Sequence, residues 1–133
     1  MQMKYDKAER LERAKALRKE GYNCSQCVAM SFDDVAGLSA GQLARVTGGF
    51  GSGFGGQGEI CGAVTGMTVV NGLVRDVARP ALYGEVRQLF GAFGGLNGSC
   101  VCRELKQPGR KPCLDLIVDA VGILHDHLAS AED

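Results

Sequence analysis

The sequence predicts an all-α fold, a compact bundle of about five to seven helices with a glycine-rich loop before a buried central helix. Apolar residues recur at three- and four-residue spacing along most of the chain, which is the period of an amphipathic helix. No segment alternates apolar and polar residues between turn signals, so strands are not expected. A chain of 133 residues with 45% hydrophobic content fits one domain spanning residues 1–133.

The first third of the chain is expected to hold three helices. Residues 5–20 place Ala and Leu at three-residue spacing among Lys, Arg and Glu, which predicts an amphipathic surface helix that Gly21 ends. Residues 23–37 and 39–47 each open with a capping-box pattern, N-x-x-Q and S-x-x-Q, and each is followed by apolar residues. Both patterns therefore predict helices with well-defined starts.

Residues 48–58, GGFGSGFGGQG, hold seven glycines in eleven positions and predict a loop rather than a helix or strand. We expect Phe50 and Phe54 to hold this loop against the core. The loop contains G-x-G-x-x-G, but it lacks the preceding strand and the later acidic residue of a dinucleotide site. Close packing of the backbone is therefore the preferred interpretation of the glycines.

The central helix is predicted over residues 60–74, which carry no charge and are apolar over about four helical turns. Gly62, Ala63 and Gly66 form a strip of small residues on this segment. Such a strip allows a neighbouring helix or a bulky cofactor to approach the helix backbone closely.

The remainder of the chain predicts two longer helices and one short turn. Residues 80–93 begin with proline and end at a glycine pair, residues 102–105 can form one turn, and residues 112–128 carry a regular apolar seam. The two histidines of the last helix, His125 and His127, point to different faces and so do not form a metal pair. We expect both to be exposed to solvent.

The composition excludes several classes of partner. Lys+Arg and Asp+Glu balance at 15 each, so the chain lacks the basic footprint of nucleic-acid-binding proteins. The first residues are charged and the longest apolar run is too short and too rich in glycine for a bilayer, so neither a secretory signal nor a membrane span is expected. We expect a cytoplasmic protein, and the apolar seams of so small a domain are compatible with a homodimer.

The six cysteines are the strongest chemical signal. Three of their four clusters lie where a helix is predicted to begin, and a helix start favours the thiolate that reacts or binds metal. In a reducing compartment this favours metal binding, redox chemistry or inert core sulfur over disulfides. The clusters are Cys24/Cys27, Cys61, Cys100/Cys102 and Cys113.

The run GFGSGFGGQGEICGAVTG, with NCSQCV before it and CREL and a last cysteine after it, resembles the family of small bacterial and archaeal redox-active proteins named for its cysteine pattern, C_GCAxxG_C_C. The resemblance covers roughly residues 21–124. A similar helical domain forms part of the split-Soret cytochromes, which implies an iron–sulfur cluster, although the C-x-x-C-H of covalent haem attachment is absent. By motif position the family cysteines fall on Cys24, Cys61, Cys102 and Cys113, and Cys27 and Cys100 are additional.

The first hypothesis is therefore an electron-transfer protein in which these four cysteines hold an iron–sulfur cluster and serve a redox partner protein. Glycines of the loop and central helix are expected to line the cofactor and donate backbone N–H groups to its sulfurs: Gly53, Gly55, Gly56, Gly58 and Gly62. Four basic side chains are expected to offset the negative charge: Arg103, Lys106, Arg110 and Lys111.

Two alternatives stay open. In a metal-free protein the same four cysteines would be redox thiols that exchange disulfides or carry sulfur. In a non-catalytic protein they would bind a structural zinc ion and stabilise a module for protein interaction.

Overall fold

The structure is a computed structural model in which residues 1–131 are described, and it confirms the all-α prediction. Within these residues six helices have seven or more residues, and the others are single turns. The elements are α1 (Lys7–Lys19), α2 (Cys24–Met30), α3 (Ala40–Thr47), the 3-10 turn η1 (Gly48–Phe50), α4 (Gly51–Phe54), α5 (Gly62–Val74), α6 (Arg79–Asn97), α7 (Cys102–Leu105) and α8 (Cys113–Ala131).

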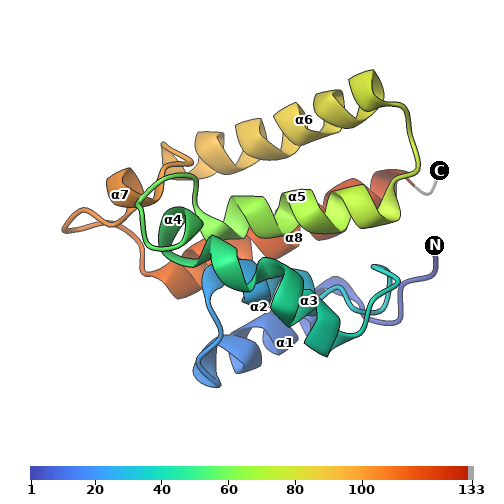
Figure 1. Cartoon of the computed structure of the whole chain (residues 1–133), viewed down its shortest axis with the longest axis horizontal. Coiled ribbons are helices and arrows are strands. Elements are labelled where there is room, and N and C mark those ends of the chain that lie inside the picture. The colour runs from blue at the N-terminus through green and yellow to red at the C-terminus, as the bar shows by residue number, and fades with distance from the viewer. Residues whose placement is uncertain (132–133) are drawn as a thin grey trace.

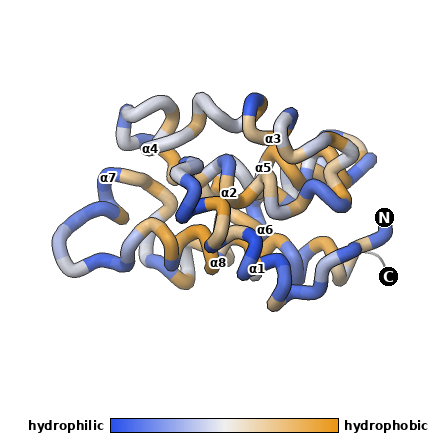
Figure 2. Tube along the Cα trace, turned by 90° about the horizontal axis from the view of Figure 1, so that it is seen from below, coloured by the Kyte–Doolittle hydropathy of each residue, from blue (hydrophilic) through white to orange (hydrophobic). Residues whose placement is uncertain are grey.

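Helix α5 occupies the centre of the bundle, as predicted (Figure 1). It packs against α2, α6 and α8, while α1 covers α8 and α2 on the other side. Figure 2 shows the apolar stretches of α2, α5 and α8 toward the interior and hydrophilic stretches at the periphery. None of the helices in residues 1–131 combines the length and the hydropathy needed to cross a bilayer.

Local capping explains where the first helices begin. The side chains of Asn23 and Ser39 accept hydrogen bonds from the backbone N–H groups of Gln26 and Gln42, and each glutamine side chain accepts one from the backbone N–H of its cap residue. Both predicted capping boxes are confirmed, and each cap stabilises its helix by about 1 kcal/mol. A third box at Asp6 starts α1 and was not predicted.

Helix α2 ends at Met30, seven residues before the predicted end, because a long-range contact competes with the helix. The carbonyl of Ser31 accepts a 2.7 Å hydrogen bond from Nη1 of Arg10, which lies on α1. The guanidinium of Arg10 also forms two bonds to Asp34, of 2.6 and 2.8 Å, in the link that follows. These bonds draw residues 31–38 into turns.

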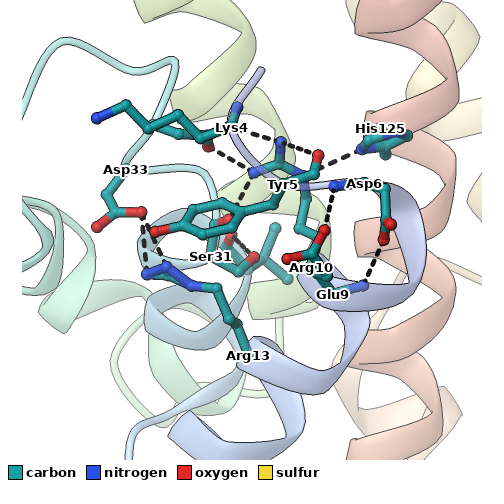
Figure 3. A network of polar contacts seen from close by, with 11 residues as sticks. Lys4, Tyr5, Asp6, Glu9, Arg10, Arg13, Ser31, Asp33 and His125 are labelled. Carbon is teal, nitrogen blue, oxygen red and sulfur yellow. Dashed lines mark hydrogen bonds and ion pairs between the residues drawn. The ribbon is translucent and has the colours of Figure 1, made fainter.

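This polar cluster joins four parts of the chain (Figure 3). Arg10 is fully buried, and its Nε donates to Nδ1 of His125 on α8 at 3.0 Å. Its guanidinium also stacks over the ring of Phe32 at 4.3 Å. The backbone N–H of Lys4 donates to Asp34, so the cluster fastens the N-terminal segment, α1, the link after α2 and α8 together.

The prediction that both histidines are exposed was wrong. His125 accepts the bond from buried Arg10, and the pKa of His125 is lowered by burial and by the nearby cationic charge. His127 lies within 3.1 Å of Asn71 on α5 and of Glu85 on α6, and its side chain is only 15% exposed. The two rings do point to different faces, but each face is covered.

The small-residue strip on α5 has the predicted effect, and its neighbour is α2. A Cβ added at Gly66 would lie 2.8 Å from the carbonyl oxygen of Ser25 and 3.0 Å from Cβ of Val28. A Cβ at Gly62 would lie 3.1 Å from the backbone nitrogen of Ser25. The start of α5 therefore touches the start of α2 through backbone atoms.

Helix α6 continues past the predicted glycine pair to Asn97. It ends at Gly98, whose left-handed conformation (φ 82°) and N–H bond to the Gly94 carbonyl close the last turn. Glycine adopts a positive φ without a steric penalty and so commonly ends a helix. The glycine that ends α6 is Gly98, three residues after the pair Gly94-Gly95.

Candidate functional site

Cysteines from all four clusters occupy helix starts, one cluster more than the three that were predicted to do so. Cys24, Cys102 and Cys113 are the first residues of α2, α7 and α8, and Cys61 is the N-cap of α5. The starts of these helices lie at the same end of the bundle, near α4 and α7 in Figure 1. Four helix starts, each with a cysteine, thus lie in one region of the molecule.

A short antiparallel pairing fixes the position of Cys61 relative to Cys102. Ile60 and Val101 form a β-bridge, with the Cys61 N–H bonded to the Cys100 carbonyl at 2.7 Å and the Cys102 N–H bonded to the Glu59 carbonyl at 2.6 Å. The bridge lies just before two helices and involves only one residue pair. Sequence periodicity could not reveal it, since no alternating run surrounds it.

The glycine loop does not stay open over its whole length. Residues 48–54 wind into η1 and α4, and Ser52 and Gly53 within α4 adopt left-handed backbone angles (φ 52° and 72°). A Cβ at Gly53 would lie 2.6 Å from the Glu59 nitrogen and 2.7 Å from Cβ of Cys102. Gly53 therefore lets the loop lie directly on Glu59 and on the start of α7.

The five glycines predicted to line a cofactor differ in their surroundings. Gly53 lies against Cys102. A Cβ added at Gly62 would lie 3.3 Å from Cβ of Cys24. Gly58 lies against Arg103, whereas Gly55 faces only backbone of the loop and Gly56 faces open space. Contact with the cysteines is thus limited to Gly53 and Gly62.

The two phenylalanines of the loop do not both reach the core. Their rings pack edge to face with centroids 5.2 Å apart. Phe50 is half-buried, but Phe54 is 51% exposed, so the prediction that Phe54 holds the loop against the core was wrong. The positive φ of Phe54 (71°) turns the chain there, and the loop is held instead by backbone bonds of Gly58 and Glu59 to residues 52 and 53.

The side chains of Cys24 and Cys113 interact directly. A hydrogen bond between the two side chains lowers the pKa of Cys113 to about 6, helped by the positive charges of Lys106 and Arg18. The same bond, together with burial, raises the pKa of Cys24. Cys24 is buried and Cys113 half-buried, so the pair consists of a protonated inner thiol and an outer thiolate.

Cys61 lies beside this pair. Burial raises its pKa, while the backbone N–H groups of Ala63 and Val64 at the start of α5 favour its thiolate. The charges of Cys102 and Cys113 also act on Cys61, and the charge of Cys61 acts on Cys24. Cys61 is therefore the electrostatic neighbour of the other three cysteines of the motif.

The two additional cysteines point elsewhere. Cys27 is fully buried and its Sγ donates to the Tyr22 carbonyl at 3.5 Å, and Sγ of Cys100 donates to the Phe90 carbonyl at 3.3 Å. Burial raises the pKa of each thiol to about 11. The charge of Cys61 also raises the pKa of Cys100, whereas it has no such effect on Cys27.

Of the four basic residues expected at the site, Lys106 acts on Cys113. The other three have different partners: Arg103 pairs with Glu59 at 3.1 Å, Arg110 donates to the Asn97 carbonyl and Lys111 pairs with Asp119. Arg18 was missed by the sequence reasoning, although its charge acts on both Cys24 and Cys113. Its position in the last turn of α1, directly before the turn into α2, was the available signal.

No three His, Cys, Asp or Glu side chains in residues 1–131 are already grouped closely enough to hold a single metal ion. Four sulfurs around one zinc ion would be about 3.8 Å apart, given Zn–S distances of about 2.3 Å and tetrahedral geometry. The arrangement gives no support to a preformed zinc site. An iron–sulfur cluster is a larger body, and its thiolate ligands stand further apart.

Comparison with known proteins agrees with the cysteine pattern. Neither the search of curated proteins nor the search of solved structures found a match. The family model described as "Putative redox-active protein (C_GCAxxG_C_C)" matches residues 22–127, a range that includes all four helix-start cysteines and the loop that positions them. On this match the chain belongs to the C_GCAxxG_C_C family.

Proposed function

We propose that Cys24, Cys61, Cys102 and Cys113 form one redox site that holds an iron–sulfur cluster and transfers electrons to a partner protein. The observation that carries the proposal is the convergence of four separate helix starts, each with a cysteine, at one end of the bundle. Four thiolates are the usual ligand set of two-iron and four-iron clusters.

The surroundings suit an anionic group held by sulfur. Helix starts present unpaired N–H groups and the positive end of the helix dipole, and those of Ala63 and Val64 already point to Cys61. Arg18 and Lys106 add positive charge beside Cys24 and Cys113. When bound, a cluster would supply one-electron redox chemistry, and these groups would hold its ligands as thiolates and tune its potential.

The proposal is tested on protein purified without oxygen. Iron and sulfide per chain and the visible spectrum are measured for the wild type and for a serine variant at each of the four cysteines. We expect brown wild-type protein and loss of iron in each variant. Cys27→Ala is the matched control, because Cys27 lies on the same helix as Cys24 but has its thiol bonded to the Tyr22 carbonyl. Colourless wild-type protein after anaerobic reconstitution with iron and sulfide would refute the proposal.

A second function, thiol–disulfide exchange, is favoured by the Cys24–Cys113 pair. The Cys113 thiolate would attack a substrate disulfide, forming a mixed disulfide and releasing one substrate thiol. Cys24 would then attack Cys113, giving the Cys24–Cys113 disulfide and the second substrate thiol. Two electrons pass from the protein to the substrate, and turnover requires a dithiol reductant. Colourless protein that reduces a small disulfide only when both cysteines are present would support this function.

A further inference from the structure

The antiparallel bridge at the site has a fixed register. Ile60 is opposite Val101, and the Cys61 N–H bonds to the Cys100 carbonyl at 2.7 Å. One step forward on the first segment and one step back on the second bring Cys61 opposite Cys100. In an antiparallel pair, residues opposite each other carry their side chains on the same face. The two thiols therefore stand on one side of this short ribbon.

We propose that Cys61 and Cys100 form a reversible disulfide that withdraws Cys61 from the four-thiol site. Opposite residues in such a pair have Cα atoms about 5.5 Å apart and Cβ atoms about 4.5–5.5 Å apart. A disulfide needs Cα atoms about 4.4–6.8 Å apart and Cβ atoms about 3.5–4.5 Å apart. The register thus brings the two residues within a small local adjustment of disulfide geometry. The inference rests on the proposed function, because Cys61 is one of the four ligands.

The two sulfurs differ in their hydrogen bonds, which assigns their roles. Cys61 Sγ faces the backbone N–H groups of Ala63 and Val64 at the start of α5. Cys100 Sγ donates its proton to the Phe90 carbonyl and so is a protonated thiol. We therefore assign Cys61 as the sulfur that attacks the oxidant, because the two N–H groups can stabilise the negative charge that develops on it, and Cys100 as the resolving thiol, which rotates away from α6 to reach it.

Hydrogen peroxide is a suitable oxidant, because both thiols are almost buried (3% and 4% exposed) and peroxide is close to water in size. The Cys61 sulfur attacks one peroxide oxygen as its thiol proton leaves, the O–O bond breaks, and a sulfenic acid and one water form, the departing hydroxide taking up that proton. Cys100 then attacks the Cys61 sulfur, the S–S bond forms and the S–O bond breaks. The leaving hydroxide takes the Cys100 proton as water, so two thiols and one peroxide give one disulfide and two waters.

The disulfide would leave three free thiols in the motif, which is one ligand short of a cluster. A dithiol reductant would restore the fourth. Cys100, which the family pattern does not require, would thus protect Cys61 from irreversible oxidation when the site contains no metal.

The test uses iron-free full-length protein treated with peroxide, blocked with N-ethylmaleimide and digested with trypsin without reduction. Trypsin separates the relevant cysteines into peptides 20–45 (Cys24 and Cys27), 46–75 (Cys61), 88–103 (Cys100 and Cys102) and 111–133 (Cys113). We expect peptide 46–75 to be linked to 88–103 in the wild type and in Cys102→Ser, and not in Cys100→Ala. Circular dichroism checks that each variant is folded. A link that disappears in Cys102→Ser but persists in Cys100→Ala would overturn the proposal, as would a link from 46–75 to 111–133 alone.

A second measurement separates this inference from the proposed function. Peroxide-treated wild-type protein should take up almost no iron until dithiothreitol is added and should then recover fully, whereas Cys100→Ala should not recover. If the 61–100 link forms but no variant or condition yields iron, the cluster proposal fails and the disulfide stands. If iron binds and oxidation is equally reversible in both proteins, the disulfide proposal fails alone.

Discussion

The Cys24–Cys113 contact predicts the reactivity of Cys113 in metal-free protein. The hydrogen bond from Cys24 is the largest cause of the lowered pKa of Cys113, ahead of the charges of Lys106 and Arg18. Cys24→Ala removes this donor. Cys24→Ser keeps a hydroxyl in the same place and can still donate a hydrogen bond to the thiolate. The two variants therefore separate the loss of the bond from the loss of the sulfur.

The expected magnitude follows from the thiolate fraction. At pH 7 a thiol with a pKa of about 6 is about 90% ionised, whereas one at the unperturbed value of 9.0 is about 1% ionised. A full return to 9.0 would lower the thiolate concentration about 90-fold. The more basic thiolate is intrinsically more nucleophilic, so the net fall in rate at pH 7 is roughly 3- to 10-fold. At pH 5.5 the fall is larger, because the wild type is still about one quarter ionised.

The assay is alkylation by iodoacetamide, followed by mass spectrometry of peptide 111–133, whose only cysteine is Cys113. The rate is measured from pH 5 to pH 10. We expect a midpoint near 6 for the wild type, a midpoint displaced toward 9 for Cys24→Ala, and little displacement for Cys24→Ser. Cys27→Ala controls for loss of a buried sulfur from α2. If Cys24→Ala keeps the wild-type midpoint, the contact does not control Cys113 and the reasoning is wrong.

Three further predictions concern stability, each measured by urea unfolding. Gly66→Ala should destabilise the protein by about 1–3 kcal/mol, because the new Cβ would clash with the backbone of α2. Gly72 lies in the same helix, but a Cβ there would have no neighbour within 4 Å, so Gly72→Ala should stabilise the protein by about 0.5–1 kcal/mol. Asp34→Ala should cost about 3–5 kcal/mol, because it leaves the fully buried charge of Arg10 without its partner; a loss under 1 kcal/mol would contradict this. The hydrogen bonds from Arg75 lower the pKa of Glu85. The ionised Glu85 therefore contributes stability above the unfolded value of 4.5, and this contribution is lost as the pH falls through the folded value. Glu85→Gln should flatten the pH dependence of the free energy of unfolding in that acid range.

The parts of the fold that the sequence predicted are those set by local interactions. The capping boxes at Asn23 and Ser39 act within four residues, and the strip at Gly62 and Gly66 needs only the absence of side chains. The end of α2 could not be predicted in this way, because it depends on Arg10, some twenty residues earlier in the chain.

The same distinction applies to the candidate site. The helix-start positions of the cysteines follow from local signals, and the family pattern selects four of the six. The single-pair bridge between Ile60 and Val101, and the approach of Arg18 to the thiols, arise only when distant segments meet. For the same reason, nearness in sequence to Cys102 and Cys113 did not reveal that Arg103, Arg110 and Lys111 have partners other than the thiols.

The polar cluster around Arg10 lies where α1, α8 and the N-terminal segment meet, and α5 and α8 both contribute to the apolar core. Small zinc fingers, by contrast, fold only when the metal is bound. If the Arg10 cluster and the apolar core are sufficient for folding, iron-free and cluster-loaded protein will have the same helical content, and loading the proposed site will not require the chain to refold.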